Sequence, residues 1–382
     1  HKGTASAESA WRKIRETLAE DGMLIEYSAT FAQVLNREKQ RQEYGKRILA
    51  DYQYRYFYHD GYGKDFKALN VDPGAEEEVY EDRALAGGLL LFYRQMRLFR
   101  QHKERLRPFN LRKPLWVFVG QTVTKEARKK LGVVEEDTHM LTDVGRVVRF
   151  LKRFLEDGAW GREAIYGAIH DSDFLGQGNN PFAPYLEDFQ GMEDDALYDD
   201  ICETVFGGQG ALDLRQLPTP GEIGLRLSAS REGAYFGLVN IGDTAGFRKL
   251  MEKEGIPIAE DPLLAKQAAG GGVEAKSLFS DIDEPMSPVN LLIGARKFAE
   301  GWSSWRVSTM ALLYIGKNQG PLIIQLFGRG VRLLGRDHSL KRSGEVWLEP
   351  LETLYIVGLK ADYVANFAAE THVDRAIEDP TI

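Results

Sequence analysis

Short apolar runs that alternate with helical stretches constrain the fold of this chain more than any other feature of its sequence. The run at residues 115–120 is continuously apolar, as in a parallel strand that is covered on both faces. Further strands are predicted at residues 235–241, 289–293, 309–315 and 353–357, and helices at residues 142–156, 244–254 and 319–330. This alternation predicts an α/β protein with a mainly parallel, doubly wound sheet.

The segment before this pattern is predicted to hold separate elements. They are a helix at residues 8–20, a buried strand at 23–27, a hairpin at 47–70 and a long helix at 78–107. The hairpin is suggested by aromatic, partly alternating residues with turn signals at Asp60-Gly61 and Gly63. Pro108 ends the long helix, which we expect to connect two lobes.

The composition limits the kinds of site that the chain can hold. The single cysteine, Cys202, excludes an internal disulfide, and the seven histidines lack metal-ligand spacing, so we predict no metal site. There is no apolar run long enough to cross a bilayer, which predicts a cytoplasmic protein without a membrane partner. The net charge of −8 disfavours coating of nucleic acid by bulk charge, but local basic patches can still contact phosphates.

The most informative motif runs from Gln325 to Arg332, with the sequence Gln-Leu-Phe-Gly-Arg-Gly-Val-Arg. Its arginines, Arg329 and Arg332, are three residues apart and therefore share one helical face. Arginine suits bidentate contact with phosphate oxygens, and the two glycines permit a close backbone approach. The alternative interpretation is a solvated basic helix end.

A second motif, residues 294–307, follows one predicted strand and precedes another, where doubly wound folds place binding loops. Its tryptophans, Trp302 and Trp305, could stack on bases or pack the loop. Two shorter signals lie upstream: Ser28-Ala29-Thr30 after one predicted strand, and Gln121-Thr122 after the strand that ends in Gly120. The tripeptide Ser28-Ala29-Thr30 carries no weight without its order relative to the other motifs.

In this order the motifs resemble motifs III, IV, V and VI of superfamily-2 helicases of the DEAD/DEAH-box type. The chain is most similar to the helicase (Res) subunit of type III restriction enzymes and related defence helicases. Lys297, Phe298, Glu300, Gly301 and Trp302 carry the closer match, together with residues 325–333. The resemblance spans about residues 1–360.

The resemblance implies a RecA-like, P-loop NTPase type of fold. Residues 1–76 would be the remnant of a first lobe and residues 77–110 a helical connector. Residues 111–382 would be a complete second lobe with a loop-rich insertion at about 157–230. The function implied is an ATP-dependent DNA helicase or translocase of a restriction or phage-defence system, with single- or double-stranded DNA and a modification or specificity subunit as partners.

The resemblance also implies roles at the ATP site. Arg329 and Arg332 would approach the γ-phosphate, one of them as an arginine finger, and Gln325 would position water or phosphate. The residues implied in coupling nucleotide state to movement are His1, Ser28, Thr30, Glu300, Gly301 and Ser303. Many members of the superfamily have aspartate where Ser303 stands, so its expected ribose contact lacks a charge.

Nucleic-acid contacts are implied at Gln121, Thr122, Lys297 and Trp302. Independently, near-helical spacing places Arg97 and Arg100 on one basic track, with Lys103 and Arg107, and a second track holds Arg146, Arg149 and Arg153. The alternative for each track is a solvated helix face.

ATP and Mg²⁺ are the implied cofactors, yet the chain has no Gly-x-x-x-x-Gly-Lys-Ser/Thr phosphate loop. We therefore expect half of an ATP site, with the Mg²⁺ ligands outside the chain and no hydrolysis by these residues alone. His1 is either the histidine of a DExH box or merely the first residue of the chain. The alternative functions are an RNA helicase and a non-catalytic module that binds nucleic acid or a protein partner.

Overall fold

The computed structural model describes residues 13–20, 22–25, 27, 42, 48–50, 52, 54–71, 77–120, 143–176, 178–231, 234–241, 244–262, 277–294, 302–313 and 320–359. The chain divides into two compact units, His1–Asp51 and Tyr52–Ile382. The second unit contains the sheet and all of the described site residues.

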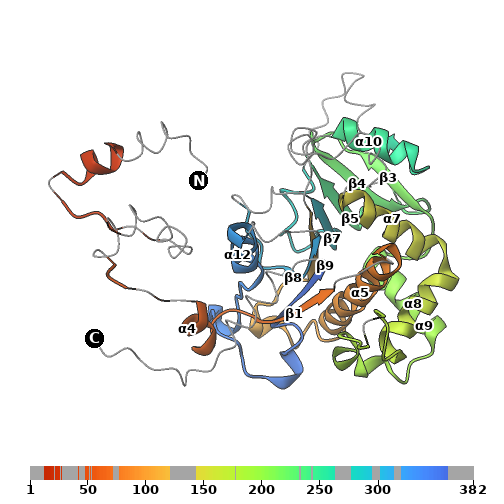
Figure 1. The fold of residues 1–382 in the computed structure, drawn as a ribbon, viewed down its shortest axis with the longest axis horizontal. Coiled ribbons are helices and arrows are strands. Elements are labelled where there is room, and N and C mark those ends of the chain that lie inside the picture. Colours follow the sequence, from red (N-terminus) through yellow and green to blue (C-terminus); the bar gives the residue numbers. More distant parts are fainter. Residues whose placement is uncertain are drawn as a thin grey trace. The chain divides into compact units, whose positions relative to one another are not determined.

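The described residues of the second unit form a nine-stranded sheet in the order β1-β9-β8-β2-β7-β5-β4-β3-β6 (Figure 1). The strands are β1 (Asp65–Val71), β2 (Leu115–Gly120), β3 (Leu212–Gln216), β4 (Glu222–Leu227), β5 (Gly237–Asn240), β6 (Ile258–Glu260), β7 (Leu291–Gly294), β8 (Val307–Leu313) and β9 (Thr353–Leu359). All neighbours pair in parallel except β4, which is antiparallel to β3 and β5. The predicted α/β class with a mainly parallel sheet is confirmed.

Helices cover both faces of this sheet (Figure 1). One face carries α5 (Glu77–Gln101), α7 (Asp143–Glu156), α8 (Gly158–His170), α9 (Asp194–Ile201) and α10 (Thr244–Lys253), and the other carries α4 (Tyr54–His59) and α12 (Gly320–Gly330). In β2, Trp116 and Phe118 face the first helical layer, while Val117 and Val119 face the second. Burial on both faces explains why this strand is continuously apolar.

Helix α5, which was expected to connect two lobes, packs directly on the sheet. Its Gln95 is fully buried and donates hydrogen bonds to the carbonyl oxygens of Pro350 and Thr353, at 2.7 and 2.9 Å. Thr309 on β8 donates to the Gln95 side-chain oxygen at 3.0 Å. The segment expected to connect lobes is therefore part of the sheet unit, which also includes β1.

The hairpin predicted at residues 47–70 is wrong. The structure has α4 followed by β1, which pairs with β9 along its whole length. Tyr54 and Tyr58 are one helical turn apart and pack on Phe66, and Tyr54 also meets Phe327 at 4.8 Å between ring centroids. Aromatic residues suit strands, but here the helical spacing places both tyrosines, half-buried, on Phe66.

The loop-rich insertion predicted at about residues 157–230 is also more ordered than expected. It contains α8 and α9, and its two strands, β3 and β4, join the sheet. Charged residues on β3 and β4 obscured the hydrophobic pattern by which strands are predicted. Asp213 on β3 binds Arg215 on the same strand and Arg226 on β4, at 2.9 and 3.1 Å. Paired charges can occupy a half-buried strand face that the hydrophobic pattern marks as polar.

In the first unit, residues 13–18 are helical, within the predicted helix. The buried strand predicted at residues 23–27 is wrong for the described part of that segment. Met23, Leu24, Ile25 and Tyr27 form neither helix nor strand and are 43–92% exposed. An apolar run becomes a strand only where another strand supplies hydrogen-bonding partners, and the described residues of this unit include none.

Candidate functional site

The predicted arginine motif lies at the amino end of the parallel strands. Helix α12 follows β8 and ends near the points where β1 and β8 begin. Lys64, just before β1, donates from its backbone N–H to the Val331 carbonyl at 2.7 Å and from its ammonium to the Val307 carbonyl at the start of β8. The described part of the second motif, residues 302–306, leads into the first residue of β8. The end of α12 and this loop therefore meet at one edge of the sheet.

One face of α12 is held tightly against the sheet. Leu326 and Phe327 are buried, and Gly330 approaches β8 and β9 so closely that a Cβ atom would lie 2.7 Å from Leu354 and 2.9 Å from Met310. Gly330 therefore permits close packing of α12 on the sheet. Gly328 faces open space, so the structure gives no packing reason for that glycine.

The outward side of the same segment presents the two arginines. Arg329 donates from Nε to the Trp302 carbonyl at 2.6 Å and from Nη1 to the Gln325 carbonyl at 3.1 Å. Arg332 lies just beyond the helix and donates from Nη1 to the Ser303 hydroxyl. The structure thus brings together five predicted site residues: Gln325, Arg329, Arg332, Trp302 and Ser303.

The charge of this cluster is uncompensated within the described part of the chain. Arg329 and Arg332 are half-buried, and the structure records no carboxylate bound to either there. Burial, and secondarily the charge of Arg332, lower the pKa of Arg329. A guanidinium stays protonated in proteins, so the shift measures an unfavourable environment that an anion would relieve.

The loop that meets the arginines is held rigidly by Arg306. This residue is 3% exposed and donates to the carbonyl oxygens of Lys113 and Val289, at 2.9 and 2.6 Å, and also to that of Ile282. These bonds tie the loop to the chain just before β2 and β7. Arg306 thereby acts as a structural clamp, and its pKa is lowered to about 10 by burial.

The two tryptophans of the loop have different environments. Trp302 is half-buried, and its ring lies 6.1 Å from Phe279 in the core beneath α12. Trp305 is 37% exposed. Trp302 therefore packs partly against the core, while Trp305 keeps a surface on which a ligand could stack.

Several predicted site residues lie outside the described residues. They are His1, Ser28, Thr30, Gln121, Thr122, Lys297, Glu300 and Gly301. The strands that precede two of these loops are neighbours, since Val119 of β2 pairs with Gly294 of β7. The expected motif IV and motif V loops therefore start side by side, at the carboxyl end of the strands.

Arg97 and Arg100 lie on α5, on the opposite face of the sheet from α12. Arg100 binds Asp200 at 2.5 Å, and Arg97 lies 4.0 Å from the same carboxylate. In the second basic track, Arg146, Arg149 and Arg153 bind Glu81, Glu78 and Asp82 of α5, respectively. These arginines link α5 to its neighbouring helices, and contact with nucleic acid would require them to exchange partners.

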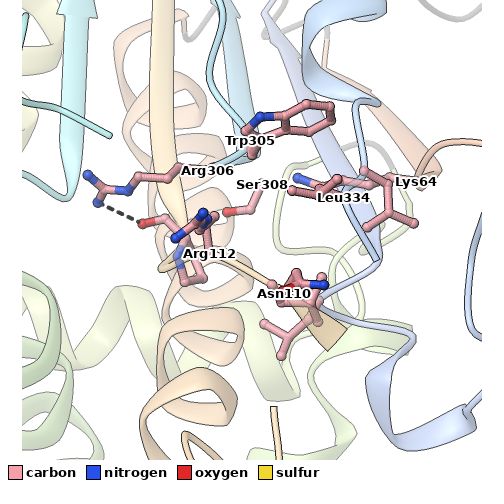
Figure 2. A pocket seen from close by; sticks show the side chains of 11 residues that line it. Lys64, Asn110, Arg112, Trp305, Arg306, Ser308 and Leu334 are labelled. Carbon is pink, nitrogen blue, oxygen red and sulfur yellow. Dashed lines mark hydrogen bonds between the residues drawn. The ribbon is translucent and has the colours of Figure 1, made fainter. Parts of the chain in front are cut away.

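The sequence interpretation missed a buried lysine beside the arginine cluster. Lys64 is 3% exposed and lines a cavity together with Trp305, Arg306 and Leu334 (Figure 2). In sequence it lies between Gly63 and Asp65, where a turn and a solvated side chain are the natural expectation. No local pattern distinguishes it.

Within the described ranges, no group of three or more His, Cys, Asp or Glu side chains could hold a metal ion. None of the helices described is both long and apolar enough to cross a bilayer. No family model, curated protein or solved structure matches the chain.

Proposed function

We propose that this chain supplies the arginine side of an ATP-dependent nucleic-acid motor and that Arg329 and Arg332 bind the phosphates of the nucleotide. The observation that carries the proposal is the pair of half-buried guanidiniums that bind only neutral oxygens in the described structure. The other arginines that the sequence singled out, on α5 and α7, face carboxylates instead. Uncompensated arginines on a rigid edge suit an anionic ligand.

In this function, a complementary lobe with a phosphate loop would hold the nucleotide against the arginine edge. As the γ-phosphoryl group leaves, its charge is redistributed, and a guanidinium placed against it stabilises the transition state more than the ground state. Gln325 is exposed one turn before Arg329, where it can orient water or a phosphate oxygen. DNA is the proposed track, with Mg²⁺ supplied together with the nucleotide.

The first test measures binding of a fluorescent ATP analogue to the 382-residue chain. We expect Arg329→Ala and Arg332→Ala each to weaken binding about tenfold or more, because each removes a charge-assisted contact. Arg→Lys at either position should recover little, since lysine keeps the charge but loses the planar fork. Arg231→Ala is the matched control, because Arg231 is exposed and its side chain has no partner in the described structure.

The second test measures turnover with the complementary lobe present, at saturating ATP and nucleic acid. Loss of an arginine finger should reduce kcat by about 10³–10⁵ while the thermal unfolding midpoint stays near that of the unchanged protein. Near-normal kcat in both alanine variants would show that the two arginines only solvate the end of α12. A melting curve for each variant separates loss of chemistry from loss of fold.

A further inference from the structure

The cavity around Lys64 is strongly biased toward positive charge. Its lining includes Lys64, Arg112 and Arg306, with Ser308, Asn110 and Trp305 among the uncharged residues (Figure 2). No aspartate or glutamate lines it. Its volume is about 330 Å³ with its open mouth included, but the enclosed part admits only about one water-sized group.

Lys64 is the unusual member of this lining. Its ammonium donates to the Val307 carbonyl, which is the only partner that the described structure gives it, and it has two further N–H donors. Burial lowers its pKa to about 7. A buried ammonium without a carboxylate is costly, so an anion at this point would be stabilised strongly.

The charged groups around Lys64 either bind other protein groups or line the cavity. Asp65 binds Tyr58 and Lys67, and Glu352 binds Ser343. Arg306 donates to four carbonyl groups, and Arg342 donates to those of Tyr58, Tyr62 and Gly63. Arg112 is exposed at the lining, and the described residues include no partner for it. Arg306 uses four of its five N–H donors, so Lys64 and Arg112 are the charged lining residues with the most donors left for a ligand.

We propose that this cavity is a second anion site that binds a phosphate group, with one oxygen inserted to Lys64 and the others at Arg112. The enclosed space matches a single oxygen, and the planar guanidinium of Arg112 suits the remaining oxygens. Trp305, partly exposed at the cavity, can stack on a base attached to that phosphate. The ligand class is therefore a phosphate ester, either of a free nucleotide or of a nucleic-acid backbone.

The lining of this site does not include Arg329 or Arg332. Binding of a phosphate at this site should be coupled to proton uptake by Lys64. Above about pH 7 the Lys64 amine is neutral in the unliganded protein, so a bound phosphate draws a proton onto it. Phosphate binding should therefore be accompanied by proton uptake and should weaken as the pH rises above 7. A lysine that merely bridges β1 and β8 would show neither effect.

The test is calorimetric titration of the 382-residue chain with inorganic phosphate, ATP and a single-stranded oligonucleotide, each in two buffers of different ionisation enthalpy. We expect buffer-dependent heats that report proton uptake. Lys64→Met should abolish the uptake and weaken phosphate binding about tenfold or more. Arg112→Ala should weaken binding without changing stability, because Arg112 is exposed. This second variant tests the site even if Lys64→Met does not fold.

Lys249→Met is the charge-matched control, because Lys249 is exposed on α10, on the other face of the sheet. If binding of ATP or of the oligonucleotide depends on both Lys64 and Arg112, the site is supported. The probe that shows this dependence identifies the source of the phosphate. Unchanged affinity in both variants, or heats independent of the buffer, would overturn it. Arg329→Ala, titrated in parallel, reports on the arginine pair alone, so failure of one proposal is distinguishable from failure of the other.

Discussion

Lys64 and Arg329 show how the value of a single charge depends on its partners. Arg100 and Arg146 each have a carboxylate within hydrogen-bonding distance, and these ion pairs join neighbouring helices. Arg329 and Lys64 bind backbone oxygens, so most of their charge remains available to a ligand. The residue type alone does not distinguish these two situations.

Lys64 also makes a testable contribution to stability. Its pKa is about 7 in the folded protein, below the ordinary value of 10.5, so between these values the unfolded chain holds a proton that the folded protein lacks. Stability should therefore rise with pH across this interval and lose that contribution as the pH falls toward 7. In urea unfolding between about pH 8 and pH 10, Lys64→Met should remove a slope of about 1.4 kcal/mol per pH unit.

The comparison that isolates Lys64 is the difference between the unchanged protein and Lys64→Met at each pH, because other titrating groups contribute equally to both. Parallel stability curves for the two proteins would contradict the low pKa. They would mean that water reaches the ammonium of Lys64 in the folded state.

At the scale of an element, α12 combines a packed face with an exposed one. Leu326, Phe327 and Gly330 hold the helix on β8 and β9, while Gln325 and Arg329 face outward. The close packing fixes where the arginines emerge, because a rigid helix transmits the position of its buried face to its outer one. The geometry of the candidate site thus depends on the packing of Gly330 against Leu354 and Met310.

Two glycine substitutions test whether α12 has one packed and one exposed face. Gly330→Ala should destabilise the protein by about 1–3 kcal/mol, because its Cβ would lie within 3 Å of Leu354 and Met310. Gly328→Ala should stabilise it by about 0.5–1 kcal/mol, since that position is exposed and open, and alanine favours the helix. Chemical denaturation of both variants measures the two effects, and equal shifts of one sign would refute the packing argument.

At the scale of the whole molecule, the sheet unit begins at Tyr52, well before the predicted second lobe. β1 forms the edge of the sheet and carries Phe66, Leu69 and Val71 into both cores. We therefore expect β1, although it precedes α5, to be required for the integrity of this unit.

Truncation provides the corresponding prediction. A chain of residues 52–382 should unfold at nearly the same denaturant midpoint as the full 382 residues. A chain of residues 77–382 should lose most of its stability, because each large side chain removed from the cores costs about 1.5–3 kcal/mol and a whole protein has only about 5–15 kcal/mol. If the shorter chain is as stable as the longer one, β1 does not belong to the unit.

The sequence by itself determined the α/β class and the positions of β2, β5, β7, β8 and β9, because each buried parallel strand is a local apolar run. It also determined that Arg329 lies in the last turn of a helix and Arg332 just beyond it, since helical spacing is local as well. The tertiary structure alone decided that α4 is a helix and that β1 pairs with β9. It also decided which arginines are neutralised and that Lys64 is buried. Those outcomes depend on partners far away in the chain: β9 lies almost three hundred residues after β1, Asp200 lies 100 residues from Arg100, and Val307 lies 243 residues from Lys64. A local pattern carries no information about which distant group will meet a side chain, and burial and charge pairing are set by that meeting.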